Sequence, residues 1–149
     1  MKPVLYILMP NDVDSMNPGK KMAQASHAAN AFVRDALDVY GLESDRIFER
    51  AFLEWCNETP QGFGTVIVLQ IPYHELHDKI RYIRELGNVQ FNEFNTPTGI
   101  VTDPTYPISD GTVTHVVSFD TCGYVFVNDT NNRFDIVAAY LKENFELHD

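Results

Sequence analysis

Residues 3–9 read PVLYILM, a continuous apolar run that ends at Pro10 and is followed by the polar pair Asn11 and Asp12. A strand with one face in water alternates apolar and polar residues, whereas a strand covered on both faces is apolar throughout. We therefore expect residues 3–9 to form a strand inside a sheet that carries helices on both sides.

The segments after this strand have the periodicity of either helices or strands. In the first part of the chain they predict helices over 19–40 and 44–58, a strand over 65–71, a helix over 72–87 and a strand over 89–94. A turn-rich loop over 95–111 and a strand over 112–119 follow. The last part contains a bend at 122–123, a short strand or hairpin arm over 124–127 and a last helix between 134 and 145. The order β-α-α-β-α-β-β-α predicts an α/β fold, a three-layer α/β/α sandwich with a small mixed β-sheet.

The chain has 149 residues, of which 44% are hydrophobic. This size suits one domain, residues 1–149, whose core needs no disulfide or metal. Cys56 and Cys122 are too few and too far apart for a disulfide framework, and we expect both to be packing residues. No apolar run is as long as a membrane span and no leader segment precedes the first strand, so we expect a cytoplasmic protein without membrane contact.

The charge balance is acidic, with 11 basic and 21 acidic side chains and a formal net charge of −10. Such a chain has no overall attraction to the phosphates of nucleic acids. Salt screens exposed charges beyond about 8 Å, however, so a local patch of Lys20, Lys21 and Arg34 could still hold a few phosphates.

The helix predicted after the first strand begins with an unusual stretch, in which residues 19–29 read GKKMAQASHAA. Helical spacing places Lys20, Gln24 and His27 along one stripe. The first turn also offers unpaired backbone N–H groups and the positive end of the helix dipole. Five alanines between positions 23 and 31 leave no bulk, so the helix can lie close to a sheet. Together these features predict a helix start that holds an anion.

This pattern, Gly-Lys-x-x-Ala-Gln-x-x-His-Ala after a strand, resembles the type 2 peptidyl-tRNA hydrolases, a family of small α/β esterases. A second motif supports the resemblance: Asp103 matches the family aspartate, and Gly-Thr-Val-Thr at 111–114 matches the family's Gly-Thr-x-Thr strand entry. Between them, Pro-Thr-Tyr-Pro at 104–107 replaces the family's Ala-Gly, basic residue and Thr-Gln, with one residue fewer. Thr105 is the candidate for the missing threonine.

The resemblance implies that the chain hydrolyses the ester bond of peptidyl-tRNA, or of N-blocked aminoacyl-tRNA, without metal or cofactor. It implies tRNA as the partner and, more weakly, a homodimer. The residues that it marks as catalytic are Lys20, Asp103 and Thr114. The residues that it marks as substrate-binding are Gly19, Lys21, Gln24, His27, Thr105 and Thr112.

Ester hydrolysis needs a positioned water, a group that accepts or orients its proton, and donors aimed at the developing oxyanion. Lys20 can supply positive charge to the oxyanion or to a nearby phosphate. Asp103 can orient Lys20 or the water, and the Thr114 hydroxyl can donate a hydrogen bond. Histidine can accept a proton near neutral pH, so His27 is either a base or a structural residue of the helix.

A second interpretation stays open, in which the same scaffold is a noncatalytic binding module for an RNA end, a small anion or a protein partner. The acidic charge and the altered segment after Asp103 favour the module, whereas the intact motif over 19–29 favours the enzyme.

Two other site patterns fail. Gly19-Lys20 is not a nucleotide-binding phosphate loop, because Asp14 occupies the first required glycine position and Lys21 stands where a magnesium-binding serine or threonine is needed. His74 and His77 have the spacing of paired metal ligands, but no third ligand is signalled nearby, so we expect no metal site there.

Overall fold

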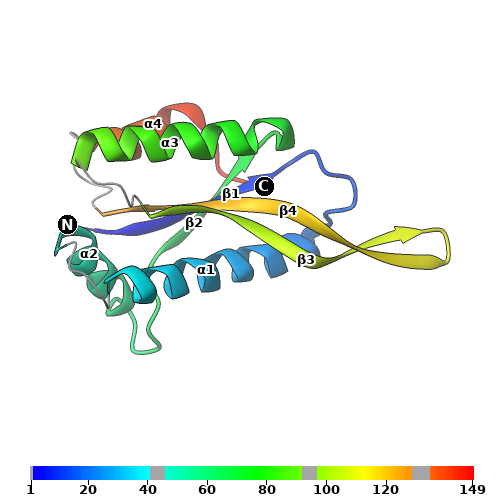
Figure 1. Cartoon of the computed structure of the whole chain (residues 1–149), viewed down its shortest axis with the longest axis horizontal. Coiled ribbons are helices and arrows are strands. Elements are labelled where there is room, and N and C mark those ends of the chain that lie inside the picture. The colour runs from blue at the N-terminus through cyan, green and yellow to red at the C-terminus, as the bar shows by residue number, and fades with distance from the viewer. Residues whose placement is uncertain (1, 41–45, 92–96, 129–134) are drawn as a thin grey trace.

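The computed structural model describes residues 2–40, 46–91, 97–128 and 135–149, which form a four-stranded sheet with helices on both faces (Figure 1). The elements in chain order are β1 (Val4–Pro10), α1 (Pro18–Tyr40), α2 (Arg46–Cys56), β2 (Val66–Ile71), the 3-10 helix η1 (Tyr73–Glu75), α3 (Leu76–Phe91), β3 (Thr98–Asp110), β4 (Val113–Val127) and α4 (Ile136–Asn144). Figure 1 shows α1 and α2 on one side of the sheet and α3 and α4 on the other. The predicted α/β class and element order are confirmed.

The strand order in the sheet is β2-β1-β4-β3. The first strand, β1, is parallel to β2 and antiparallel to β4, and all seven of its residues are buried. This confirms the prediction of a strand covered on both faces. The edge strands are β2 and β3. A short C-terminal segment lies along β2, where the Gln70 N–H donates to the Glu146 carbonyl at 2.9 Å and the His148 N–H donates to the Val68 carbonyl at 3.0 Å.

The core is divided into two clusters by the sheet, because alternate residues of β1 point to opposite faces. On the α1 side, Phe32 packs edge-on against Trp55 and stacks on Phe126, with ring centroids 5.4 and 4.7 Å apart. On the α3 side, Ile80 and Ile83 pack with Leu141 of α4. Within the described ranges no helix is long and apolar enough to cross a membrane.

The end of the third helix differs from the prediction. Gly87 does not end it, and Val89 to Phe91, expected to begin a strand, form its last turn; residues 92–94 of that expected strand lie outside the described residues. Gly87 is buried, and it continues at helical spacing the buried stripe of Leu76, Ile80 and Ile83. Gly87 therefore packs on the buried face of α3 and does not terminate the helix, although glycine often does.

The third strand lies where a loop was predicted. Residues 98–110 form β3 although they contain Pro104 and Pro107. Proline is tolerated at a sheet edge and at bulges, and here the pairing with β4 shifts between Val101 and Thr102 and again between Asp103 and Tyr106. The residues that suggested turns are features of an irregular edge strand.

The fourth strand is longer than predicted and has no break. Residues 113–127 form one strand, so the expected bend at 122–123 is wrong, and the expected short strand over 124–127 is the end of β4. A Cβ atom on Gly123 would lie 2.6 Å from the Ile80 Cδ1 atom. Glycine is therefore needed there for the close approach of α3 to the sheet and not for a turn.

Beyond the body of the fold, β3 and β4 continue as a two-stranded arm (Figure 1). Its turn is at Gly111, with a φ of 62°, and Thr112. Val113 and Val116 are 54% and 61% exposed on this arm. The Gly-Thr-Val-Thr motif at 111–114 therefore lies at the end of a projecting hairpin.

Candidate functional site

A buried glutamine joins the first helix to two strands. Gln24, on α1, is 3% exposed. Its Nε2 atom donates to the Asp103 Oδ2 atom at 2.8 Å, and its Oε1 atom accepts from the Thr121 hydroxyl at 2.7 Å. The alanine-rich helix explains the close approach, since Ala28, one turn further on, is fully buried against the sheet. Both ends of the amide are satisfied, which fixes its orientation.

Asp103 lies on β3 in the irregular stretch and is 9% exposed. Its Oδ1 atom accepts from the Thr105 N–H at 2.9 Å and from the Thr105 hydroxyl at 3.1 Å. The hydrogen bond from Gln24 lowers the pKa of Asp103 most, the bonds from Thr105 lower it further, and the charge of His27 adds a smaller effect, against the opposing effect of burial. Asp103 is therefore a carboxylate at neutral pH.

Lys20 lies one turn before Gln24 on α1 and reaches the same strand. Its Nζ atom donates to the Ser15 carbonyl at 2.9 Å and to the Pro107 carbonyl at 2.8 Å. The ammonium also lies 5.2 Å from the centroid of the Tyr106 ring, whose hydroxyl is 3.1 Å from the Ser15 Oγ atom. Lysine has three N–H donors, so two hold the loop before α1 against β3 and one is left for a ligand.

The structure brings several of the predicted residues together. A direct hydrogen-bonded chain runs from Gln24 through Asp103 to Thr105, and Lys20 is bound to the same strand. His27 is exposed on α1, one turn after Gln24, and near enough to act on Asp103 electrostatically.

The remaining predicted residues lie elsewhere. Thr112 is exposed in the hairpin turn, and Thr114 is exposed on β4, where it pairs with Ser109. Within the described residues, no hydrogen bond joins Thr114 to Lys20 or Asp103. Gly19 is exposed in the first turn of α1. Lys21 follows Lys20 by about 100° around the helix and lies on the side of α1 that faces β2.

Sequence reasoning missed Thr121, the fully buried hydroxyl that orients Gln24. The residue lies in β4 opposite a register shift: Val101 pairs with Cys122 while the next residue, Thr102, pairs with Asp120, so Thr121 is left between them. Such a bulge breaks the alternation that would show on which face a strand residue lies. The surrounding sequence, Ser-Phe-Asp-Thr-Cys-Gly at 118–123, mixes polar and apolar residues and does not single out the threonine.

His77, half of the histidine pair discounted as a metal site, takes part in a different contact. Its Nε2 atom lies 3.0 Å from the Asp120 Oδ2 atom, and the Thr102 hydroxyl donates to the other carboxylate oxygen at 2.5 Å. Among the described residues, no group of three or more histidine, cysteine, aspartate or glutamate side chains could hold a metal ion.

The site thus combines a carboxylate, an ammonium, an amide and a hydroxyl in one small region between α1 and β3. No protein-family model matches this chain, and no curated protein matches its sequence. The resemblance to the type 2 peptidyl-tRNA hydrolases therefore depends on the two sequence motifs, at residues 19–29 and 103–114, alone.

Proposed function

We propose that this protein hydrolyses the ester bond of peptidyl-tRNA or of an N-blocked aminoacyl-tRNA, releasing the acyl group and free tRNA. The observation that supports this most is the hydrogen bond between Gln24 and Asp103, at 2.8 Å, which joins the two sequence motifs of the resemblance. Residues 79 positions apart in the chain meet in the way that a shared site requires.

The remaining N–H of Lys20 is the donor for the oxyanion. The carbonyls of Ser15 and Pro107 hold the ammonium in one place, so it needs little reorganisation when negative charge develops on the ester oxygen. A donor that is fixed in advance stabilises a transition state more than a mobile surface lysine does.

Asp103 acts as an orienting carboxylate in this proposal. Its lowered pKa makes it a weak proton acceptor, and its two oxygens are occupied by Gln24 and Thr105. The Thr105 hydroxyl donates to Asp103, which leaves its oxygen free to accept a hydrogen bond from the attacking water. The exposed His27 imidazole is then the group that takes the proton from that water.

The first half of α1 is basic, whereas the whole chain is acidic. Residues 18–33 of α1 include two lysines and no acidic residue, although the formal net charge of the protein is −10. The positive end of the helix dipole adds to these lysines. A phosphate of the terminal nucleotides therefore meets a positive field at the start of α1, because more distant acidic groups are screened.

A noncatalytic binding module is the second candidate, and two observations favour it. Two of the three Lys20 donors are already taken by backbone carbonyls, and Thr114 lies on the exposed hairpin. In this case the same residues bind an RNA end or a small anion, or contact a protein partner, without cleaving a bond.

Hydrolysis of N-acetyl-phenylalanyl-tRNA by the purified protein separates the two candidates. We expect the wild-type protein to cleave the ester, and Lys20→Ala to lower the rate about 100-fold to 1,000-fold, as the loss of one oxyanion donor does in other enzymes. Lys79→Ala on α3 removes the same charge on the opposite face of the sheet and serves as the matched control. A wild-type protein that retains the tRNA on a filter without cleaving it would exclude the enzyme and support the module.

A further inference from the structure

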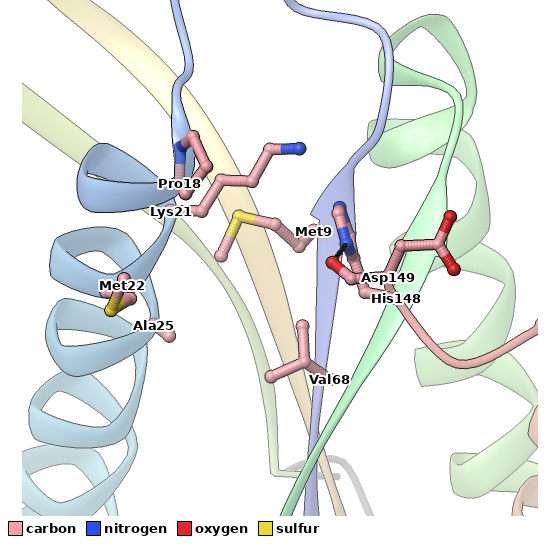
Figure 2. Close-up of a pocket in the computed structure, with 8 residues that line it drawn as sticks. All are labelled: Met9, Pro18, Lys21, Met22, Ala25, Val68, His148 and Asp149. Carbon is pink, nitrogen blue, oxygen red and sulfur yellow. Dashed lines mark hydrogen bonds between the residues drawn. The ribbon is translucent and has the colours of Figure 1, made fainter.

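A pocket lies beside the start of α1, on the side away from Asp103. It has a volume of about 290 Å³ and is formed by α1, the two parallel strands and the C-terminal residues (Figure 2). Met9 of β1, Val68 of β2 and Ala25 of α1 contribute apolar surface to it. The volume is at the lower end of the range for small-molecule sites, so the pocket suits a compact group.

The lining is apolar and adaptable. Met22 is 70% exposed although it is a large hydrophobic residue, and Figure 2 shows it on α1 at the side of the pocket. Methionine side chains are flexible and polarizable, and they adjust to the shape of a bound apolar group. The small side chain of Ala25 leaves room next to Met22. A bound apolar group would therefore cover a side chain that otherwise faces water.

A cation lies at the mouth of this pocket. In Figure 2 the Lys21 side chain extends across the pocket toward β1, and within the described residues its ammonium has no hydrogen bond or ion pair. His148 lies on the far side, with its Nε2 atom 3.4 Å from the Pro10 carbonyl and its Nδ1 atom 3.0 Å from the main-chain oxygen of Asp149. The side-chain carboxylate of Asp149 points away from the pocket. Lys21 is thus the charge that an entering ligand meets.

We infer that this pocket binds a small carboxylate with an apolar body, of the size of an aromatic or branched aliphatic side chain. The apolar body lies against Met9, Val68 and Met22, and the carboxylate pairs with the Lys21 ammonium. A single negative charge suits the site better than a phosphate dianion, because one cation is available and Asp149 adds a negative charge nearby. The inference does not depend on ester hydrolysis, since Lys20 and Asp103 do not line this pocket.

Methionine methyl groups labelled with ¹³C give a direct NMR test, because Met9 and Met22 line the pocket and Met16, which is as buried as Met9, does not. On titration with N-acetyl-phenylalanine we expect the signals of Met9 and Met22 to shift together, with a dissociation constant on the order of 1 mM. The Met16 signal should stay in place. If the Met9 and Met22 signals do not move at saturating concentrations of this probe, the pocket is not a ligand site.

The role of the charge is tested with ligands that share one apolar body. N-acetyl-phenylalaninamide lacks the negative charge and should bind about two- to fivefold more weakly, which is the range for an exposed ion pair. Lys21→Gln should weaken binding of the acid by the same factor and leave binding of the amide unchanged. Arg50→Gln, on α2, is the matched control. Equal binding of acid and amide, or tighter binding of phenyl phosphate than of the acid, would overturn the assignment to a monocarboxylate.

A third variant, Ala25→Leu, tests whether the ligand occupies this pocket. Ala25→Leu places a larger side chain in the space and should abolish the shifts of Met9 and Met22, while an unchanged Met16 signal shows that the fold is intact. Binding that persists in Ala25→Leu would place the ligand elsewhere. Because Lys21→Gln is a surface change, it keeps the test decisive even if Ala25→Leu does not fold.

Discussion

Lys20 and Lys21 are neighbours in the chain, yet they lie in opposite surroundings on the two sides of α1. The Lys20 ammonium is held by two backbone carbonyls next to a buried polar network, whereas the Lys21 ammonium crosses an apolar pocket without a partner among the described residues. A helix turns by about 100° per residue, so two equal charges reach different neighbours. Sequence adjacency at the start of a helix therefore says little about shared roles.

Ester hydrolysis should separate the two lysines most strongly. Lys20→Ala is expected to reduce the rate of N-acetyl-phenylalanyl-tRNA cleavage at least 100-fold, because a fixed oxyanion donor is lost. Lys21→Ala removes the same charge from the neighbouring position and should reduce it only severalfold, through weaker phosphate attraction. Comparison of kcat/KM for the two variants measures the difference. Equal losses would mean that only the local positive charge matters.

The buried network around Gln24 should contribute more to stability than an exposed residue of the same helix. Gln24→Ala leaves the Asp103 carboxylate without its main donor and the Thr121 hydroxyl without its nearest acceptor, so the free energy of unfolding should fall by about 2–4 kcal/mol. Ser26→Ala changes an exposed residue of the same helix and should stay within about 0.5 kcal/mol of wild type. Urea denaturation of both variants gives the values. A Gln24→Ala protein as stable as Ser26→Ala would show that the network is not stabilising.

The network should also make stability depend on pH in the acid range. The pKa of Asp103 in the folded protein lies below its ordinary value of 3.8. Its stabilising contribution is therefore present above that value and is lost as the pH falls through the folded pKa, because the unfolded chain binds the proton more tightly. The difference in free energy of unfolding between wild type and Asp103→Asn should accordingly shrink between pH 5 and pH 2. A difference that is constant over this range would contradict the lowered pKa.

The smallest effect is expected for Lys21 in the absence of ligand. Since its ammonium has no partner among the described residues, Lys21→Gln should change the free energy of unfolding by less than about 0.5 kcal/mol. Thermal or urea denaturation of the two proteins under identical conditions measures this change. A larger loss would show that Lys21 has a structural role like that of Lys20, and the contrast between the two sides of α1 would disappear.

The fold class could be predicted because its strongest signals are local. The apolar run of β1 and the stripes of the amphipathic helices depend on residues at most four positions apart in the chain, and the structure has β1 and four helices close to where they were expected. The edge of the sheet could not be predicted in the same way. Prolines 104 and 107 are compatible with β3 only because that strand lies at an edge with two register shifts, which is a property of the whole sheet.

The candidate site shows the same division. Gln24 and Asp103 were selected from sequence motifs, and they form a direct hydrogen bond. Thr121 and the Tyr106 ring next to Lys20 were not selected, since their positions depend on the register shifts that distort β3 and β4. The distance of Thr114 from this group has the same origin, because β3 and β4 continue past Lys20 as a projecting hairpin. Long-range pairing, and not residue type, decided which side chains meet.

One side of the pocket is formed by the C-terminal segment and exists only while that segment is paired with β2. His148 is held in place by backbone pairing with an edge strand, and most of its neighbours in the segment are exposed. Detachment of residues 146–148 from β2 would at once uncover the hydrogen-bonding groups of that edge and dismantle one side of the cavity. Ligand binding in the pocket and pairing of the C-terminal segment with β2 are therefore thermodynamically linked. A compound that contacts His148 would slow the exchange of the β2 amide hydrogens with solvent.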